Sequence, residues 1–169
     1  MNTRMIHRIS LIAVFVLPFT IAWATVAGAQ ALYRMGPSGG LGGAPFYDTN
    51  VPGNSKVVEV RVRHGSWIDA VQVIHDRGEL SHHGGSGGRL SRITLARGEF
   101  IRAIGGRYGR FVDSIRIWTD RRSSPIYGGS GGSVEFYYEA PEGFEIVGFL
   151  GRSGAYLDSI GVIMRKIEQ

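Results

Sequence analysis

The chain has 169 residues, 43% of them hydrophobic and 20% charged, which fits one globular domain and requires no second one. Its formal net charge is only +5 and no dense basic block is present, which argues against a nucleic-acid partner. The sequence contains no cysteine, so disulfide bonds are excluded and the fold must depend on its hydrophobic core.

The first 29 residues have the composition of a secretory signal peptide. Arg4 and Arg8 make the start positively charged, the run from Ile9 to Ile21 is almost entirely apolar, and Ala27-Gly28-Ala29 supplies a small-residue cleavage site. Cleavage there leaves residues 30–169 as one exported domain, secreted or periplasmic, with no membrane association. The alternative is a retained N-terminal membrane anchor, because the apolar stretch continues past Ile21.

Short runs of β-branched and aromatic residues follow, and they alternate with polar residues in the manner of strands. The runs are 57–62, 71–73, 93–95, 101–104, 115–117, 134–138, 146–149 and 160–162. No segment after the signal peptide carries a helical stripe, and glycines and prolines separate the runs at turn-like intervals. The chain is therefore predicted to be all-β.

One five-residue pattern occurs three times, as Gly65-Ser66-Trp67-Ile68-Asp69, Gly109-Arg110-Phe111-Val112-Asp113 and Gly154-Ala155-Tyr156-Leu157-Asp158. In each copy a glycine precedes a small or polar residue, an aromatic residue, an aliphatic residue and an aspartate, and a strand follows. The copies begin 44 and 45 residues apart, a period typical of repeated supersecondary units. Each copy is predicted to be a glycine turn that leads into a strand.

A second pattern, Gly-Gly-x-Gly-Gly, also occurs three times, at residues 39–43, 84–88 and 128–132. The second and third copies each begin 19 residues after the glycine of a turn. The turn at Gly154 would require a loop near position 173, beyond the last residue, and the loop at 39–43 takes its place. The pattern is therefore cyclic, and it predicts that Asp158 and Gly43 are neighbours in a closed threefold structure.

A unit of about 44 residues has room for four short strands. One such sheet cannot bury its apolar face alone, whereas three sheets packed around a pseudo-threefold axis share one core. Trp67, Phe111 and Tyr156 occupy equivalent places in the three turns. They either cap the end of the core or form part of the surface.

On these motifs the chain, from about Leu32 to Ile167, resembles the jacalin-related lectins, and most closely their mannose-binding branch. The resemblance implies the β-prism I fold, with three four-stranded antiparallel Greek-key sheets in pseudo-threefold symmetry. It also implies a carbohydrate-binding protein that is not an enzyme and needs no cofactor or metal.

Carbohydrate binding makes physical sense of the motifs. A hexopyranose offers hydroxyls that donate and accept, so a selective site needs a carboxylate acceptor beside fixed backbone N–H donors. A glycine loop lets a second stretch of backbone approach the ring closely. The resemblance implies that the aspartate accepts from two hydroxyls, while amides of the turn and of the facing glycine loop donate to the sugar.

Three candidate sites follow from this resemblance. The first combines Gly154, Ala155, Tyr156 and Asp158 with Gly43. The second combines Gly65, Ser66, Trp67 and Asp69 with Gly88, and the third combines Gly109, Arg110, Phe111 and Asp113 with Gly132. For each aspartate the alternative role is a carboxylate that only caps its own turn.

The expected partners are mono- or oligosaccharides and glycoconjugates of the mannose/glucose type, and homo-oligomers are possible partners as well. The galactose-binding branch uses a free N-terminal glycine, which this chain lacks at its glycine loop. His82 and His83 precede the loop at Gly84 and are expected on a solvated rim of the Asp69 site.

Other readings of the motifs are weaker. The glycine loops lack the Gly-Lys-Ser/Thr ending of a phosphate loop, and His64, His75, His82 and His83 match no metal-binding spacing. The remaining alternative to a lectin is an exported structural or protein-binding β-prism module. The two differ in whether the three carboxylates are free or are consumed by hydrogen bonds within their own turns.

Overall fold

The structure is a computed structural model that describes residues 30–168, so the predicted signal peptide at residues 1–29 lies outside the described part. The described residues form thirteen strands and no helix, as the sequence pattern predicts. The strands are β1 (Tyr33–Gly39), β2 (Ala44–Tyr47), β3 (Val57–His64), β4 (Ile68–His75), β5 (Gly78–Glu79), β6 (His83–Gly84), β7 (Arg89–Thr94), β8 (Ile101–Tyr108), β9 (Val112–Thr119), β10 (Tyr127–Gly128), β11 (Val134–Glu139), β12 (Phe144–Ser153) and β13 (Leu157–Lys166). Between residues 30 and 168, no helix long and apolar enough to cross a membrane occurs.

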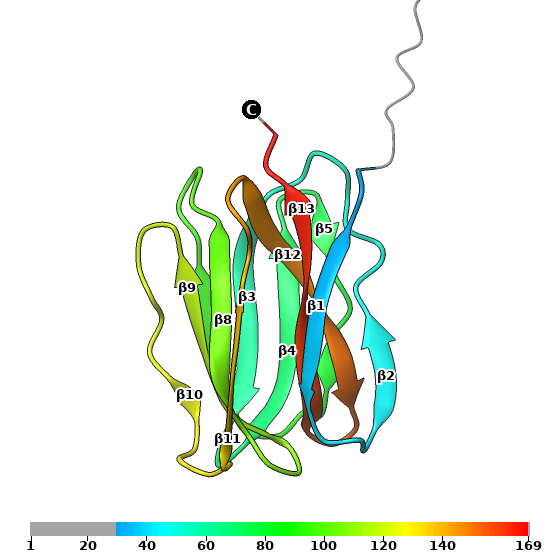
Figure 1. Ribbon diagram of the computed structural model, residues 1–169, viewed down its shortest axis with the longest axis vertical. Coiled ribbons are helices and arrows are strands. Elements are labelled where there is room, and N and C mark those ends of the chain that lie inside the picture. Colours follow the sequence, from blue (N-terminus) through cyan, green and yellow to red (C-terminus); the bar gives the residue numbers. More distant parts are fainter. Residues whose placement is uncertain (1–29, 169) are drawn as a thin grey trace, which may run out of the picture.

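The strands form three antiparallel units, each built on a long central hairpin with a shorter strand on either side (Figure 1). Unit I has the order β1-β13-β12-β2, unit II has β7-β3-β4 with β5 and β6 along β4, and unit III has β11-β8-β9-β10. Units I and III are joined into one sheet by the single pair Ile146–Ile101. The predicted three four-stranded sheets are confirmed.

Unit II departs from the other two in its outer strand. This strand is split into β5 and β6, which both pair with β4. Between them Leu80 buries its side chain in the core. The split explains why the described chain has thirteen strands where about twelve are expected.

The three central hairpins are equivalent in detail. The predicted turns connect β3 to β4, β8 to β9 and β12 to β13, and each has a register shift in the pairs just before its glycine. The glycine loops connect the outer strands β1 to β2, β6 to β7 and β10 to β11 across the same end of the hairpins. In unit I the loop comes first in the chain and the hairpin last, so the predicted cyclic closure is confirmed.

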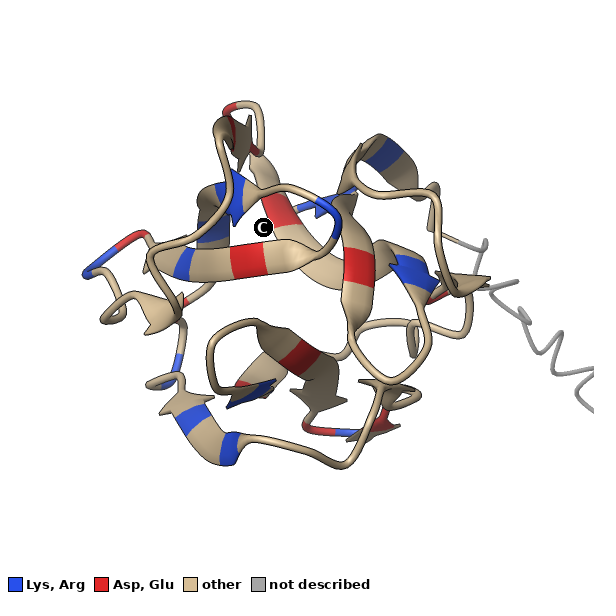
Figure 2. Ribbon diagram, turned by 90° about the horizontal axis from the view of Figure 1, so that it is seen from below, with Lys and Arg blue, Asp and Glu red and all other residues tan. Residues whose placement is uncertain are grey.

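One hydrophobic core lies between the units, which surround a common centre when viewed along the long axis (Figure 2). The alternating apolar residues of the central strands fill this core. Examples without any exposed surface are Val60 and Val62 of β3, Ile115 of β9 and Ile160 of β13. Burial of these side chains provides the main driving force for closing the three units around the axis.

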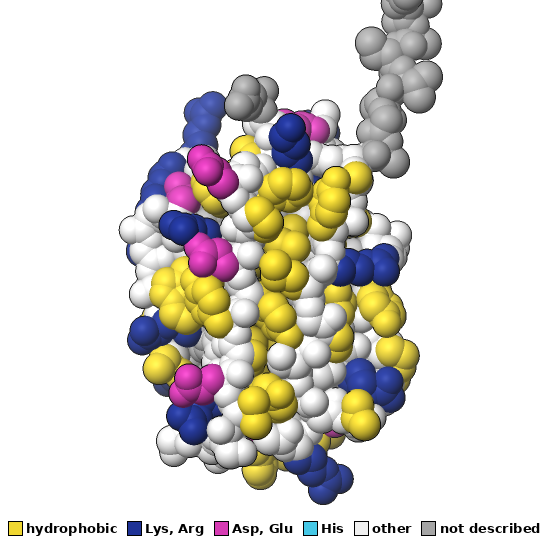
Figure 3. Space-filling model, in the orientation of Figure 1, with side chains coloured by type: hydrophobic (Ala, Val, Ile, Leu, Met, Phe, Trp, Pro, Cys, Tyr) yellow, Lys and Arg dark blue, Asp and Glu magenta, His cyan; other side chains and the backbone are white. Residues whose placement is uncertain are grey.

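The outer surface has no such uniform character. On the side of the molecule seen in Figure 3, hydrophobic side chains follow one another down the middle of the face and also lie nearer its edges, and charged side chains lie along both flanks. This mixture is normal for a protein surface, so it does not by itself mark an interface.

A buried carboxylate stabilises the turn between β7 and β8, at the end of the molecule remote from the glycine turns. Burial alone would raise the pKa of Glu99, but Ala96 N–H (2.8 Å), Thr119 Oγ1 (2.8 Å) and Arg122 Nε (2.9 Å) donate hydrogen bonds to it. These bonds favour the ionised form and lower the pKa to about 2. Ionised Glu99 therefore stabilises the folded state.

We expect acid to remove this stabilisation. Because the folded pKa of Glu99 is below that of the unfolded chain, its contribution is complete above about pH 4.5 and is lost as the pH falls towards about 2. Glu99→Gln should lower the free energy of unfolding at pH 7 by about 1–3 kcal/mol and flatten its dependence on pH in this range. Denaturant unfolding at several pH values measures both, with the exposed Glu142→Gln as the control. Parallel pH profiles for Glu99→Gln and the native protein would contradict the assignment.

Candidate functional site

The three glycine turns and the three glycine loops meet at one end of the prism, which faces the viewer in Figure 2. Each loop is fixed to its turn by the same backbone hydrogen bond, from a loop glycine N–H to the carbonyl oxygen of the aspartate. The bonds are Gly40 to Asp158 (2.8 Å), Gly85 to Asp69 (3.0 Å) and Gly129 to Asp113 (2.9 Å). The structure therefore brings together the two halves of each predicted site, including the halves from opposite ends of the chain.

The loops approach the aspartates so closely that only glycine fits at their ends. Gly43, Gly88 and Gly132 have φ values of +59°, +63° and +71°, in the left-handed region that side-chain-bearing residues rarely adopt. A Cβ atom at Gly132 would lie 2.7 Å from Asp113 Oδ2, and the same collision occurs at the other two positions. The glycine requirement thus comes from the approach to the carboxylate as well as from the turn.

The carboxylates of the three aspartates are largely shielded from solvent, yet they accept no hydrogen bond from another residue in the described part of the chain. Asp69, Asp113 and Asp158 have only 6%, 6% and 4% of their surface exposed. Within residues 30–168, no other residue donates a hydrogen bond to these carboxylates. Their oxygens also keep some contact with solvent. The side-chain atoms in this range that are fully buried without a hydrogen-bond partner belong to Gln30, Arg116 and Ser159, and not to the aspartates. Each aspartate is therefore an open acceptor and does not serve to cap its own turn.

Unused backbone donors occur in the same turn as each open acceptor and in its facing loop. The turn glycine N–H donates to the aromatic residue's carbonyl, as in Gly154 to Tyr156 (2.9 Å). The next two backbone N–H groups of each turn, and the N–H group of the last loop glycine, have no hydrogen-bond partner in the described part of the chain. These are the groups of Ala155, Tyr156 and Gly43, of Ser66, Trp67 and Gly88, and of Arg110, Phe111 and Gly132. A carboxylate beside three free N–H groups matches the alternating donors and acceptors of a sugar.

Three arginines fix the loops, and the predicted site residues did not include them. Arg152 donates from Nε to the Gly42 carbonyl and from Nη2 to the Gly43 carbonyl, both at 2.7 Å. Arg63 Nη1 donates to the carbonyls of residues 86–88 at 2.8 to 3.1 Å, and Arg107 Nε donates to Gly132 at 2.9 Å. These bonds turn the loop carbonyls away from the aspartate, which leaves the N–H groups on the side of the site.

The signal for these arginines was present in the sequence. Each lies two residues before its turn glycine, so the repeated pattern is Arg-x-Gly-x-aromatic-aliphatic-Asp. The arginine contacts a loop 23 to 110 residues away in sequence, so only the repeat itself could have drawn attention to it.

The three sites differ at their rims. The loop of the Asp158 site has Leu41 at its tip, 90% exposed, where the other loops have Ser86 and Ser130. Burial raises the pKa of Asp158, against the opposing charges of Arg152 and Arg110 and the effect of its own backbone N–H. Arg110 in turn stacks on Phe111 with 5.3 Å between the guanidinium carbon and the ring centre.

The histidines considered as metal ligands have structural partners. His83, expected on a solvated rim, is buried: its Nε2 lies 2.6 Å from Asp48 Oδ1 and its ring stacks on Phe46 at 3.9 Å. The expectation was wrong because Asp48, 35 residues away, provides a buried polar partner that no local pattern reveals. His82 is exposed and contacts the Gly85 carbonyl (3.1 Å), so it does lie at the rim.

The other two histidines are also engaged. His75 bonds Ser55 Oγ (2.8 Å) and the Val147 carbonyl (2.9 Å), and burial lowers its pKa. His64 bonds Ser91 Oγ (2.9 Å) and accepts from Gly128 N–H (3.3 Å). Across residues 30–168 no three His, Asp or Glu side chains are grouped so as to hold a metal ion.

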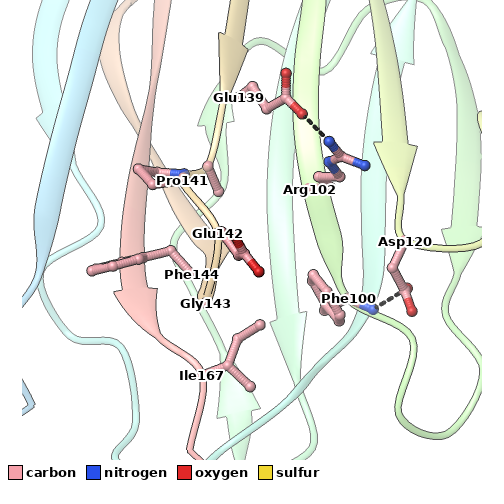
Figure 4. A pocket seen from close by; sticks show the side chains of 10 residues that line it. Phe100, Arg102, Asp120, Glu139, Pro141, Glu142, Gly143, Phe144 and Ile167 are labelled. Atoms are coloured by element: carbon pink, nitrogen blue, oxygen red, sulfur yellow. Dashed lines mark hydrogen bonds and ion pairs between the residues drawn. The ribbon is translucent and has the colours of Figure 1, made fainter.

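A hollow of about 650 Å³ lies at the opposite end of the prism, between the starts of β8 and β12 and the end of β13 (Figure 4). Its polar groups are partly used within the protein, because Glu139 pairs with Arg102 and Asp120 accepts from Phe100 N–H (3.0 Å). It contains no residue of the glycine turns or glycine loops, so it is separate from the candidate sites.

Removal of the Arg152 guanidinium should loosen the 39–43 loop without unfolding the protein. Arg152→Met keeps the aliphatic stem but deletes two hydrogen bonds, so backbone amide exchange in residues 39–43 should accelerate about tenfold. The free energy of unfolding should change by no more than about 1 kcal/mol, because the side chain is partly exposed. Hydrogen exchange read by mass spectrometry tests this, with the exposed Arg92→Met as the matched control. Unchanged exchange at 39–43 would show that the backbone alone holds the loop.

Comparison with known proteins places this geometry in a family. Residues 35–163 match the model of the jacalin-like lectin domain. A banana lectin is 27% identical, with a TM-score of 0.72 over 81% of this chain and 100% of that one. A mannose-specific jacalin-related lectin from Morus nigra, solved in complex with mannose, is 26% identical with a TM-score of 0.70 over 84% and 99%. A mannose-binding jacalin-related lectin from Ananas comosus is 25% identical, with a TM-score of 0.68 over 80% and 99%.

These matches agree with the predicted family, the β-prism fold and the expectation that the chain is not an enzyme. The chain belongs to the jacalin-like lectin family and is a carbohydrate-binding lectin.

Proposed function

We propose that this lectin binds mannose- or glucose-type glycans reversibly, through the three sites formed by the glycine turns and glycine loops. The observation that carries the proposal is the open carboxylate of each aspartate. It accepts no hydrogen bond from another residue in the described range, and free backbone N–H groups occur in its own turn and in the facing loop. The mannose-binding neighbours from Morus nigra and Ananas comosus support this choice of sugar.

In the proposed complex the aspartate accepts hydrogen bonds from two adjacent hydroxyls. The turn amides then donate to a hydroxyl and to the ring oxygen, and the last loop glycine donates to another hydroxyl. These bonds are charge-assisted on one side and fixed by backbone on the other, so little ordering is required on binding. No step in this process makes or breaks a covalent bond.

A single site of this kind is shallow and is expected to bind a monosaccharide at around millimolar Kd, roughly 4 kcal/mol. Three sites on one end of the molecule raise the effective concentration for a second contact with the same branched target. Useful affinity is therefore proposed to come from glycans with several suitable terminal sugars.

The rival function is a protein-binding or purely structural prism. That function predicts aspartates whose carboxylates are consumed by their own turns, which would make the motifs a requirement of folding alone. Within residues 30–168 no other residue donates a hydrogen bond to the three carboxylates, which favours sugar binding. We further propose that the lectin acts outside the cytoplasm, on the basis of the signal-like first 29 residues.

A triple variant tests the sites directly. Asp69→Asn, Asp113→Asn and Asp158→Asn together keep the size of each side chain but replace an acceptor by a group that also donates, so calorimetric binding of methyl α-mannoside should weaken at least tenfold. Binding by the native lectin should survive a metal chelator. Asp120→Asn, on the opposite end of the prism, is the control. The proposal fails if the native protein ignores mannosides and glucosides at about 10 mM, or if the triple variant binds as the native protein does.

The Asp158 site should also respond to pH. Its raised pKa means that protonation occurs at a higher pH than the ordinary value of about 3.9, so binding should be lost as the pH falls through that raised pKa. Above the same pKa the ionised carboxylate destabilises the folded state, and Asp158→Asn should therefore not lower the free energy of unfolding at pH 7. Titration of an Asp69→Asn, Asp113→Asn variant isolates this site. A binding midpoint below pH 3.9 would contradict the raised pKa.

A further inference from the structure

The aromatic residues of the three turns meet one another at the centre of the end that carries the sites. Ring centroids are 5.8 Å apart for Trp67 and Phe111, 5.3 Å for Trp67 and Tyr156, and 5.0 Å for Phe111 and Tyr156. Trp67 makes edge-to-face contacts with both other rings, at interplanar angles of 67° and 66°, and Phe111 and Tyr156 are tilted by 48° to each other. We call these three side chains, one from each unit, the aromatic triad.

The triad is not needed to close the core. Directly after each aromatic residue comes an aliphatic one, and Ile68, Val112 and Leu157 are all completely buried. They form the last layer of the core at this end, with the triad outside them. Trp67 remains 39% exposed, and Phe111 and Tyr156 are only partly buried. Three large aromatic side chains that gather in contact with solvent are unusual without a binding role.

The triad is continuous with all three candidate sites. Each aromatic residue lies two positions before a site aspartate, and its own backbone N–H is one of the free donors of that site. Each loop also packs closely against a neighbouring unit. A Cβ atom at Gly40, Gly85 or Gly129 would collide with the backbone of a turn in a different unit, so there is no space between the loop and that turn. The three sites and the triad are therefore parts of one rigid surface.

From this arrangement we propose that the aromatic triad is a shared contact surface for the inner sugar of a branched oligosaccharide. The terminal hexoses of two or three branches occupy the aspartate sites, and the residue from which they branch lies over the triad. The C–H groups on one face of a pyranose are apolar and carry a slight positive charge, so they pack on the negative faces of aromatic rings. This inference rests on the proposed function, since it requires sugar in the aspartate sites.

The polar surroundings suit a branch-point sugar better than a second terminal one. Arg110 lies over one side of the triad, at 5.3 Å from the Phe111 ring, and its exposed guanidinium is able to donate to a hydroxyl or glycosidic oxygen. The triad contains no carboxylate. It therefore offers a surface on which a sugar ring can stack, but not the hydrogen-bond acceptor with which an aspartate site selects a terminal hexose. Its contribution should therefore appear only with ligands that extend from a site towards the axis.

Trp67→Leu tests the inference, because leucine keeps an apolar side chain above Ile68 and removes the largest ring. Calorimetry compares a branched mannotrioside with methyl α-mannoside on the same variant. The ratio of the two affinities should fall about tenfold relative to the native protein. The branched ligand should change the native tryptophan fluorescence, and this change should disappear in Trp67→Leu. Trp118→Leu, the same substitution on the β9 strand of unit III, should preserve both the ratio and the change.

The outcomes separate the two proposals. If the native protein binds neither ligand, the proposed function itself fails. If it binds both but Trp67→Leu weakens them equally, the triad only shapes the turns and the inference is overturned. Should Trp67→Leu fail to fold in thermal unfolding, Phe111→Leu and Tyr156→Leu apply the same comparison to the other two rings.

Discussion

The close approach of each glycine loop to the end of a central hairpin is the constraint on which the rest of this structure depends. One backbone hydrogen bond, such as that from Gly40 to the Asp158 carbonyl (2.8 Å), fixes each loop to its turn. A side chain at the adjoining glycines would strike either the carboxylate or the neighbouring unit. The absence of Cβ atoms thus permits the site and also permits the three units to close around one core.

The same approach explains why stability and function are in tension at this end of the molecule. Each aspartate is shielded by a glycine loop, yet the loop turns its carbonyl groups towards an arginine and gives the carboxylate no hydrogen bond. A shielded carboxylate without partners costs folding free energy, as the raised pKa of Asp158 shows. A bound sugar would supply the missing hydrogen bonds, so the carboxylate is stabilised only in the complex.

Threefold repetition makes the three sites similar without making them identical. The arginine contacts, the turn hydrogen bonds and the register shifts recur in every unit. Differences are confined to the rims, where Leu41 replaces a serine and Arg110 replaces a small residue. Because the backbone supplies most of the donors, such changes alter the surroundings of a site while they leave its basic geometry intact. Affinity differences between the sites should thus arise from the rims.

The sequence by itself determined the repeat, the strand-rich units, the cyclic closure and the pairing of Asp158 with Gly43, because periodic glycines and alternating apolar residues record local backbone geometry. It did not reveal that the Arg63, Arg107 and Arg152 guanidiniums hold the loops, although their spacing was visible. Only the tertiary structure decided that His83 is buried against Asp48 and that the three turn aromatics touch. These contacts join side chains from distant segments, and their distances are set by the packing of whole units, which no local pattern encodes.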